Sequence, residues 1–263
     1  LYNMKRKAIF LTLGLFILLS AGFYFNFSEG DNQMNDYSPV LIDEKTPNNP
    51  ATTAEEDIAE FLPEIVWGNK NKQQVIFTFD AGSGTHSLDH ILSVLEKYGL
   101  RGTFFITGKW AEQNSDSVRR ISEAGHEIFN HTYSHPYLTQ ITDGRIVEEL
   151  DSADRIISGI TGVSTKPHFR PPYGDRNNHV FQVAAEAGYR AVYWTVDALD
   201  WKEEEGFTAA QAKDRIMSNL KPGAIYLMHI GDNITGEILD EVFSEIQGQG
   251  YLIVPLSEGL EVE

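Results

Sequence analysis

Two histidines four positions apart are the residues of this chain with the clearest potential for chemistry. His131 and His135 follow the apolar pair Ile128-Phe129. In a helical turn this spacing lets two imidazole nitrogens reach one divalent cation. A catalytic zinc ion takes three protein ligands and a water molecule, so a further ligand has to come from elsewhere. Taken alone, the pattern also fits an ordinary pair of surface or core histidines.

Four other polar clusters stand at the ends of apolar runs, where α/β proteins display their chemistry. They are Asp80-Ala81-Gly82, Arg170-Pro171-Pro172-Tyr173, Asp197-Ala198-Leu199-Asp200-Trp201 and Leu227-Met228-His229. Each has a bland interpretation as a turn, a connector, a helix cap or a packed histidine. Together with the histidine pair they supply carboxylates, imidazoles and a guanidinium, the groups needed for proton transfer beside a metal.

Taken in order, the five clusters resemble the five motifs of the NodB-homology polysaccharide deacetylases, carbohydrate esterase family 4. The family motifs read T-F-D-D-G, H-[ST]-x-x-H, R-x-P-Y, D-x-x-D-W and L-x-H. The matching segments here are Thr78 to Gly82, His131 to His135, Arg170 to Tyr173, Asp197 to Trp201 and Leu227 to His229. The resemblance spans roughly residues 73 to 254 and departs from the motifs at Ala81.

The resemblance implies metal-dependent hydrolysis of an N-acetyl amide. His131 and His135 would hold the metal, which activates water and polarises the acetyl carbonyl. Asp80 corresponds to the general base, and Arg170 would pair with it and keep it ionised.

The remaining matches imply the other half of the reaction. His229 corresponds to the general acid, and Asp200 would raise its pKa so that it carries a proton. The backbone N–H of Tyr173 would complete an oxyanion hole. Trp201 and Leu227 would wall a small apolar pocket for the acetyl methyl group.

Ala81 stands where most of the family carries a second aspartate, the third metal ligand. A methyl group cannot coordinate a metal. We expect the cation to bind through His131 and His135, with water molecules or Asp80 completing the shell; zinc is the first expectation, and cobalt, manganese and nickel also suit such ligands. Two alternatives are a substitute ligand, with His86 nearest in sequence, and a protein that has lost the metal and binds glycans without hydrolysing them.

Composition agrees with an exported enzyme. The 263 residues contain no cysteine, so neither disulfides nor a thiolate metal site are available. The net charge of −17 disfavours nucleic acid and polyanionic partners. The charge is compatible with a neutral or amine-bearing glycan; the polysaccharide partner itself is what the family resemblance implies, and the sequence indicates no protein partner.

The amino end predicts a membrane anchor. Lys5-Arg6-Lys7 precede an uncharged run from Ala8 to Phe27, which is long enough to span a bilayer with a cytoplasmic amino end. A cleaved signal peptide and a secreted protein are the alternative. Residues 28–66 read as an acidic disordered linker. The predicted domains are residues 1–27 as anchor, 28–66 as linker and 67–263 as an extracytoplasmic catalytic domain at the cell membrane.

The elements that must position the motifs follow from apolar periodicity. We predict strands near residues 75–79, 103–106, 126–129, 191–195, 224–228 and 251–254. Predicted helices lie at 91–98, 146–160, 180–187 and 238–246. This alternation indicates one α/β domain but does not decide between an open sheet and a barrel. The family resemblance implies a distorted (β/α) barrel with the motifs at the carboxyl ends of its strands.

The predicted function is hydrolysis of N-acetyl groups on an N-acetylglucosamine-containing polysaccharide, with peptidoglycan as the first substrate. Chitin oligomers and xylan are alternative polymers, and a catalytically impaired glycan-binding protein is the alternative function. A serine esterase is disfavoured because no G-x-S-x-G motif occurs. A glycosidase using Asp80 and Asp200 would have no need of the two histidines.

Overall fold

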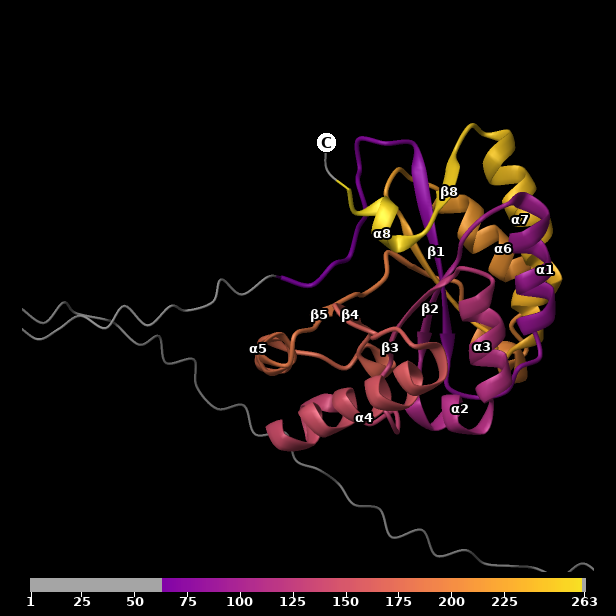
Figure 1. Ribbon diagram of the computed structural model, residues 1–263. Helices are drawn as coiled ribbons and strands as arrows, with labels where there is room; N and C mark the ends of the chain where they lie inside the picture. The colour runs from indigo at the N-terminus through magenta and orange to yellow at the C-terminus, as the bar shows by residue number, and fades with distance from the viewer. Residues whose placement is uncertain (1–62, 262–263) are drawn as a thin grey trace, which may run out of the picture. The chain divides into compact units, whose positions relative to one another are not determined.

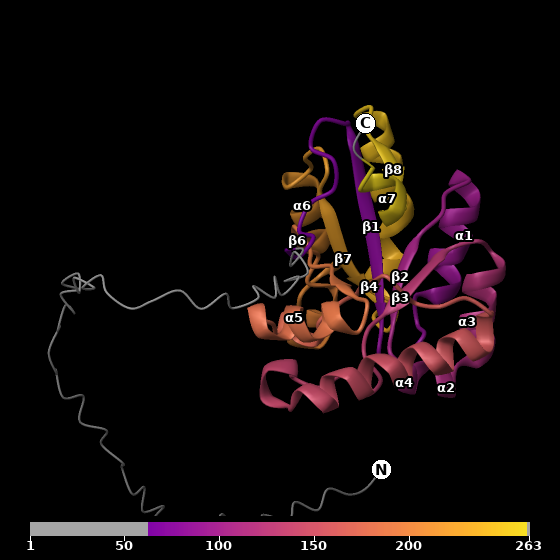
Figure 2. The ribbon, with the colours of Figure 1, turned by 60° about the vertical axis from the view of Figure 1, so that its left-hand side comes forward.

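Strand β1 (Gln74–Ala81) is buried along its whole length, as expected for a central strand covered on both faces. In the computed structural model, which describes residues 63–261, it pairs in parallel with β2 (Thr103–Ile106), β7 (Ile225–His229) and β8 (Leu252–Val254) (Figures 1 and 2). Its side chains alternate between two faces. Val75, Phe77 and Phe79 pack into an apolar cluster with the helices, whereas Thr78 and Asp80 point to the other face.

The described residues form an eight-stranded sheet with the order β5-β4-β3-β2-β1-β7-β6, and β8 is paired to β1. The strands not yet placed are β3 (Glu127–Asn130), β4 (His168–Phe169), β5 (Arg190–Ala191) and β6 (Val196–Asp197). Each strand pairing is parallel. The carboxyl ends of the strands therefore meet at one edge of the sheet, which is where the sequence motifs lie.

A short segment links the two sides of this curled sheet. Ile65 forms a parallel bridge with Val192, just past β5, and Trp67 forms an antiparallel bridge with Ala224, just before β7. The result is a half-barrel of parallel strands, so the predicted α/β class with parallel strands is confirmed. Ile65 is 4% exposed, so residues 63–66, which the sequence assigns to the linker, include a buried contact with the sheet.

Helices cover the outside of the sheet (Figures 1 and 2). The helix α7 (Asn233–Gly248) contacts α1 (Leu88–Tyr98) and α6 (Ala209–Ser218) beside β1 and β7. The helix α4 (Asp143–Thr161) contacts α2 (Gly108–Gln113), α3 (Ser115–Glu123), α5 (Asn178–Glu186) and β3. The short α8 (Leu256–Gly259) follows β8 and contacts β1.

The predicted strand at residues 191–195 is wrong, because this apolar run changes partners instead of continuing one ladder. The Val192 N–H donates to Phe169, the Tyr193 N–H donates to Ile65 at 2.7 Å, and the Thr195 N–H donates to Ile225 at 2.8 Å. Two short strands, β5 and β6, therefore flank a crossover. The other predicted strands and helices correspond to elements of the structure, with ends that differ by a few residues.

The predicted anchor at residues 1–27 and most of the predicted linker lie outside the described residues. Within residues 63–261, we find no helix with the length and apolar character needed to cross a bilayer.

Candidate active site

His131 and His135 lie in a loop that follows β3, and the expected helical turn is wrong. Thr132 and His135 have left-handed φ values of 65° and 63°, which no α-helix contains. The loop nevertheless brings the two imidazoles together: their Nε2 atoms are 3.1 Å apart and their ring planes meet at 74°. The predicted pairing of the two side chains is present, although the backbone reaches it by a different route.

The surroundings of the two imidazoles favour the neutral form that binds metals. The Nδ1 of His131 lies 2.9 Å from the carbonyl oxygen of Arg170. A carbonyl can only accept, so Nδ1 carries the hydrogen, and the lone pair of the neutral ring is on Nε2, next to Nε2 of His135. Burial lowers the pKa of His131, against the opposing effect of Asp80. Burial and the neighbouring His131 lower the pKa of His135 to about 3.

Asp80, at the carboxyl end of β1, forms a buried ion pair with Arg170. The guanidinium Nη1 lies 2.6 Å from Oδ1 of Asp80 and also donates to the hydroxyl of Thr78 at 2.9 Å. The other carboxylate oxygen lies 3.4 Å from Nε2 of His131. Burial alone would raise the pKa of Asp80, but Arg170, His131 and His229 together hold it below its usual value. Asp80 is thus an ionised carboxylate that faces the histidines.

Arg170 has no contact with solvent. Its remaining donors reach the backbone carbonyls of Val192 and Tyr193, both at 3.3 Å. These carbonyls belong to the crossover between β5 and β6, so the irregular backbone there serves to hold the guanidinium.

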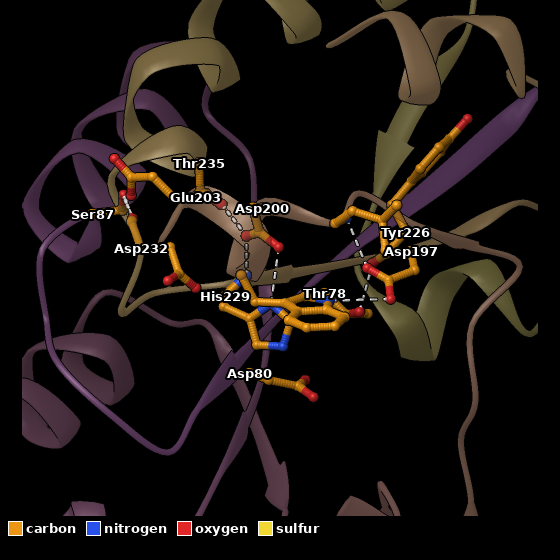
Figure 3. A network of polar contacts seen from close by, with 12 residues as sticks. Thr78, Asp80, Ser87, Asp197, Asp200, Glu203, Tyr226, His229, Asp232 and Thr235 are labelled. Atoms are coloured by element: carbon orange, nitrogen blue, oxygen red, sulfur yellow. Dashed lines mark hydrogen bonds and ion pairs between the residues drawn. The ribbon is translucent and has the colours of Figure 1, made fainter. Parts of the chain in front are cut away.

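His229, at the carboxyl end of β7, is paired with Asp200 (Figure 3). Its Nδ1 lies 2.9 Å from Oδ1 of Asp200, and its backbone N–H donates to Oδ2 at 2.6 Å. The Thr235 hydroxyl donates to the same Oδ2. Burial lowers the pKa of His229, but Asp200 and Asp80 outweigh it and raise that pKa to about 9. The imidazole is therefore protonated at neutral pH and can donate a proton.

Asp80, His131, His135 and His229 line one cavity of about 500 Å³. An ionised carboxylate and a protonated imidazole thus face the same space as two neutral imidazoles. Such a set can accept one proton, donate another and coordinate a cation.

Three other predicted residues also line this cavity: Tyr173, Trp201 and Leu227. Leu227 is 4% exposed, whereas Tyr173 and Trp201 are 59% and 44% exposed. Arg170 and Asp200 are fully buried and contact Asp80 and His229. The structure therefore brings together all nine residues singled out from the sequence.

Ala81 lies on the opposite face of β1 from Asp80. Its methyl group is fully buried in the apolar cluster with Phe79 and Ile106, and it is not among the residues that line the cavity. His86, the substitute ligand considered above, has its Nδ1 against the carbonyl oxygen of Gly231 and does not line the cavity either.

Asp232 forms a second cluster with Asp200 and His229, and the ligand atoms of the three lie within 4.8 Å of one another (Figure 3). Such a group resembles a cation site. Both oxygens of Asp200 already accept hydrogen bonds, however, and the raised pKa of His229 favours the protonated form, which cannot bind a metal. His131 and His135, with Nε2 atoms 3.1 Å apart, are neutral imidazoles, and an oxygen of the ionised Asp80 lies 3.4 Å from Nε2 of His131, so these side chains are in the protonation states that a divalent cation requires.

Tyr137 and Asp197 were given no role from the sequence. The Tyr137 ring stacks on Tyr173 at 4.2 Å, and Tyr173 in turn meets the ring of His135 at 4.4 Å. Asp197 lines the cavity and accepts from the indole N–H of Trp201 at 3.3 Å. The exposed rings of Tyr137 and Tyr173 form an aromatic platform beside the cavity. The signal in the sequence was a tyrosine two residues after His135, the second histidine of the H-x-x-x-H pair.

Comparison with known proteins finds that the model of the family described as polysaccharide deacetylase matches residues 68–192. Among relatives, the peptidoglycan-N-acetylmuramic acid deacetylase PdaA of Bacillus subtilis is 35% identical over 184 residues, which is 70% of each protein. A peptidoglycan-N-acetylglucosamine deacetylase of Bacillus cereus is 32% identical over 72% of this chain and 69% of its own length. The uncharacterised B. subtilis protein YlxY is 35% identical over 74% of this chain, and the match spans 60% of YlxY.

Solved structures give the same grouping. The structure of B. subtilis PdaA superposes with a TM-score of 0.71 at 33% identity, covering 74% of this chain and 84% of PdaA. BA3943 of Bacillus anthracis, described as a CE4 family pseudoenzyme, has a TM-score of 0.71 at 31% identity and covers 75% of this chain and 69% of its own. A mutant of BA3943 is described as having restored enzymatic activity.

Proposed function

This chain belongs to the polysaccharide deacetylase family, and from that premise we propose that it hydrolyses N-acetyl groups on an N-acetylglucosamine-containing polysaccharide, with peptidoglycan as the substrate. One observation carries the proposal. Asp80 and His229 are held in opposite protonation states and line the same cavity as His131 and His135. A base and an acid poised in this way suit amide hydrolysis.

In this proposal His131 and His135 would hold the cation, and Asp80, with an oxygen 3.4 Å from Nε2 of His131, is the neighbouring carboxylate. When bound, a divalent cation would lower the pKa of a water molecule and polarise the acetyl carbonyl. Zinc is the proposed metal, and cobalt, manganese and nickel suit the same ligands.

Asp80 acts first in the proposed reaction. Its carboxylate accepts the proton of the attacking water, and Arg170 keeps that carboxylate ionised and oriented. The backbone N–H of Tyr173, a residue with a left-handed φ of 57° in the turn beside the cavity, donates to the oxygen of the acetyl carbonyl as negative charge develops there.

His229 completes the proposed reaction. It donates its proton to the nitrogen of the breaking C–N bond, so that acetate and a free sugar amine leave. Asp200 holds the imidazole through Nδ1, which directs Nε2 toward the substrate. Trp201 and Leu227 wall the space for the acetyl methyl group.

The names of the relatives support peptidoglycan as the substrate, since PdaA and the B. cereus protein are both named for it. The uncharged run from Ala8 to Phe27 supports a single-pass membrane protein whose catalytic domain lies outside the cell, where this polymer is found.

A second candidate function is glycan binding without hydrolysis. Ala81 offers no ligand, and BA3943, which has a similar fold, is described as a pseudoenzyme. The intact pairs Asp80–Arg170 and His229–Asp200 favour the enzyme over this alternative.

Digestion of treated peptidoglycan, followed by mass spectrometry of the fragments, tests the proposal and identifies the sugar. We expect the N-acetylglucosamine residues of peptidoglycan to lose acetyl groups. Chitin oligomers and xylan, treated with the protein in parallel, are expected to lose fewer or none. Peptidoglycan that keeps all its acetyl groups, while the chain still sediments with it, would favour the glycan-binding alternative.

A further inference from the structure

We propose that Glu149, on α4, is a positioning residue that fixes the loop carrying His135 and thereby sets the affinity of the site for its divalent cation. The inference rests on the proposed function, because it takes His131 and His135 to be the metal ligands.

Glu149 is tied directly to that loop. Its carboxylate accepts the backbone N–H of Ser134 at 2.6 Å and the Ser134 hydroxyl at 2.7 Å. Ser134 immediately precedes His135. The carboxylate therefore holds the backbone by hydrogen bonds one residue before His135, whose imidazole lines the cavity.

The position of Glu149 is unusual for a carboxylate. It is 2% exposed and lies on the face of α4 whose other buried residues are Ile146, Leu150, Ala153 and Ile157. A buried carboxylate is unfavourable unless donors surround it. Here Ser134 supplies two donors and Arg145 supplies a third at 3.1 Å. Two of the three hydrogen bonds that stabilise the buried carboxylate therefore come from the loop.

The loop itself needs such support. Thr132 and His135 both adopt left-handed φ values, which are disfavoured for residues that carry a Cβ atom. The amide oxygen of Asn130 accepts the Thr132 N–H at 2.8 Å, and the Thr132 hydroxyl accepts the His135 N–H at 3.2 Å. These bonds hold the first half of the loop, and Glu149 holds the second.

α4 anchors both halves. The amide of Asn130 donates to the backbone carbonyl of Leu150 at 2.9 Å, one residue beyond Glu149. The residues that precede His131 and His135 are therefore hydrogen-bonded to adjacent residues of one turn of α4. Loss of the Glu149 contact frees His135 while His131, held by Arg170 through Nδ1, keeps its place.

The test measures zinc affinity of the metal-stripped full chain by competition with a chromophoric chelator, which needs no catalytic activity. We expect Glu149→Gln to raise the Kd for zinc by ~10 to 100-fold, the size typical of a lost partner behind a metal ligand. Glu148→Gln is the matched control. Glu148 also pairs with Arg145, but its side chain is 60% exposed, and its variant is expected to bind zinc as the wild type does.

Ser134→Ala provides a second reading if Glu149→Gln does not fold. It removes one of the two loop bonds and leaves the carboxylate and the buried helix face in place, so we expect a several-fold rise in Kd with a smaller loss of melting temperature in the metal-free chain than Glu149→Gln shows. A merely structural role would lower the melting temperature and leave the Kd of the folded chain unchanged.

Wild-type zinc affinity in folded Glu149→Gln or in Ser134→Ala overturns the positioning role. A wild-type chain that binds zinc but releases no acetate contradicts the proposed function and leaves this measurement intact. A wild-type chain that binds no zinc contradicts both.

Discussion

The guanidinium of Arg170 lies 2.6 Å from the carboxylate of Asp80, and neither side chain is more than 6% exposed. This pair sets the ionisation of the proposed base. Since the pKa of Asp80 is lowered in the folded chain, its ionisation contributes stability above its unfolded pKa of about 3.8, and that stability is lost as the pH falls through the lower folded value.

Arg170→Met removes the cation and leaves burial to raise the pKa of Asp80. The acid limb of the pH profile of kcat/KM is expected to move to higher pH. Urea unfolding at pH 7 is expected to show a loss of roughly 3 to 5 kcal/mol, the cost of an unpaired buried charge. Arg155→Met, at an exposed position on α4, is the control. An unchanged acid limb in a folded Arg170→Met chain would contradict the assignment of Asp80.

Asp200→Asn tests the proposed acid. The pKa of His229, raised to about 9 by Asp200 against the effect of burial, is expected to fall toward its ordinary value near 6.5. The basic limb of kcat/KM then moves to lower pH, because less of the imidazole is protonated. Asp240→Asn, an exposed carboxylate on α7, should leave the profile in place.

The same pair makes a stability prediction with a defined sign. A raised folded pKa contributes stability that is fully present below the unfolded pKa of about 6.5 and is lost as the pH rises through about 9. The free energy of unfolding of the wild type is expected to decline over this range more than that of Asp200→Asn. Parallel declines in the two proteins would argue against the pairing.

How far the site could be predicted depended on whether a residue stands at the end of a long apolar strand. Asp80 and His229 follow such strands, and parallel pairing brings strand ends together, so their meeting was predictable. The loop conformation of His131 and His135 was not, because Thr132 and His135 take left-handed φ values without a glycine to signal them.

Residues that act through tertiary contact were missed for a different reason. Glu149 reads as one polar position of an amphipathic helix, and only the folding of α4 beside β3 places it on Ser134. The helix α6 was not predicted because it is short and its buried residues are only Ala212 and Ile216, too few for a clear period. The family resemblance, more than periodicity, indicated the curled β/α arrangement.

Ala81→Asp is expected to change how much zinc binding stabilises the folded chain. A carboxylate at this buried position faces the apolar cluster in the metal-free chain and should destabilise it by roughly 1 to 3 kcal/mol. In the family motif that this chain resembles, this position carries the third metal ligand. Zinc binding, which would require the end of β1 to turn the new carboxylate toward the cavity, should therefore raise the melting temperature of this variant more than that of the wild type. Ala81→Ser, which adds polarity without charge, is the control. Equal zinc-induced shifts in all three chains would contradict a ligand role for position 81.

Tyr137→Ala tests the aromatic platform beside the cavity. An exposed stacked pair suits the apolar face of a sugar ring. Removal of Tyr137 is expected to raise KM for glycan oligomers by about tenfold, equivalent to about 1.4 kcal/mol of binding, while kcat stays within about twofold. Leu252→Ala, 64% exposed on β8, controls for loss of an exposed apolar side chain. A fall in kcat with unchanged KM would count against a binding role.

Acetate release from peptidoglycan by the metal-stripped full chain, before and after addition of zinc, tests the central claim most directly. We expect no release without metal, release on addition of zinc, and none from Asp80→Asn or His131→Ala under the same conditions. Release that survives complete removal of metal, or no release with zinc, cobalt, manganese or nickel, would contradict a metal-dependent deacetylase built on these residues.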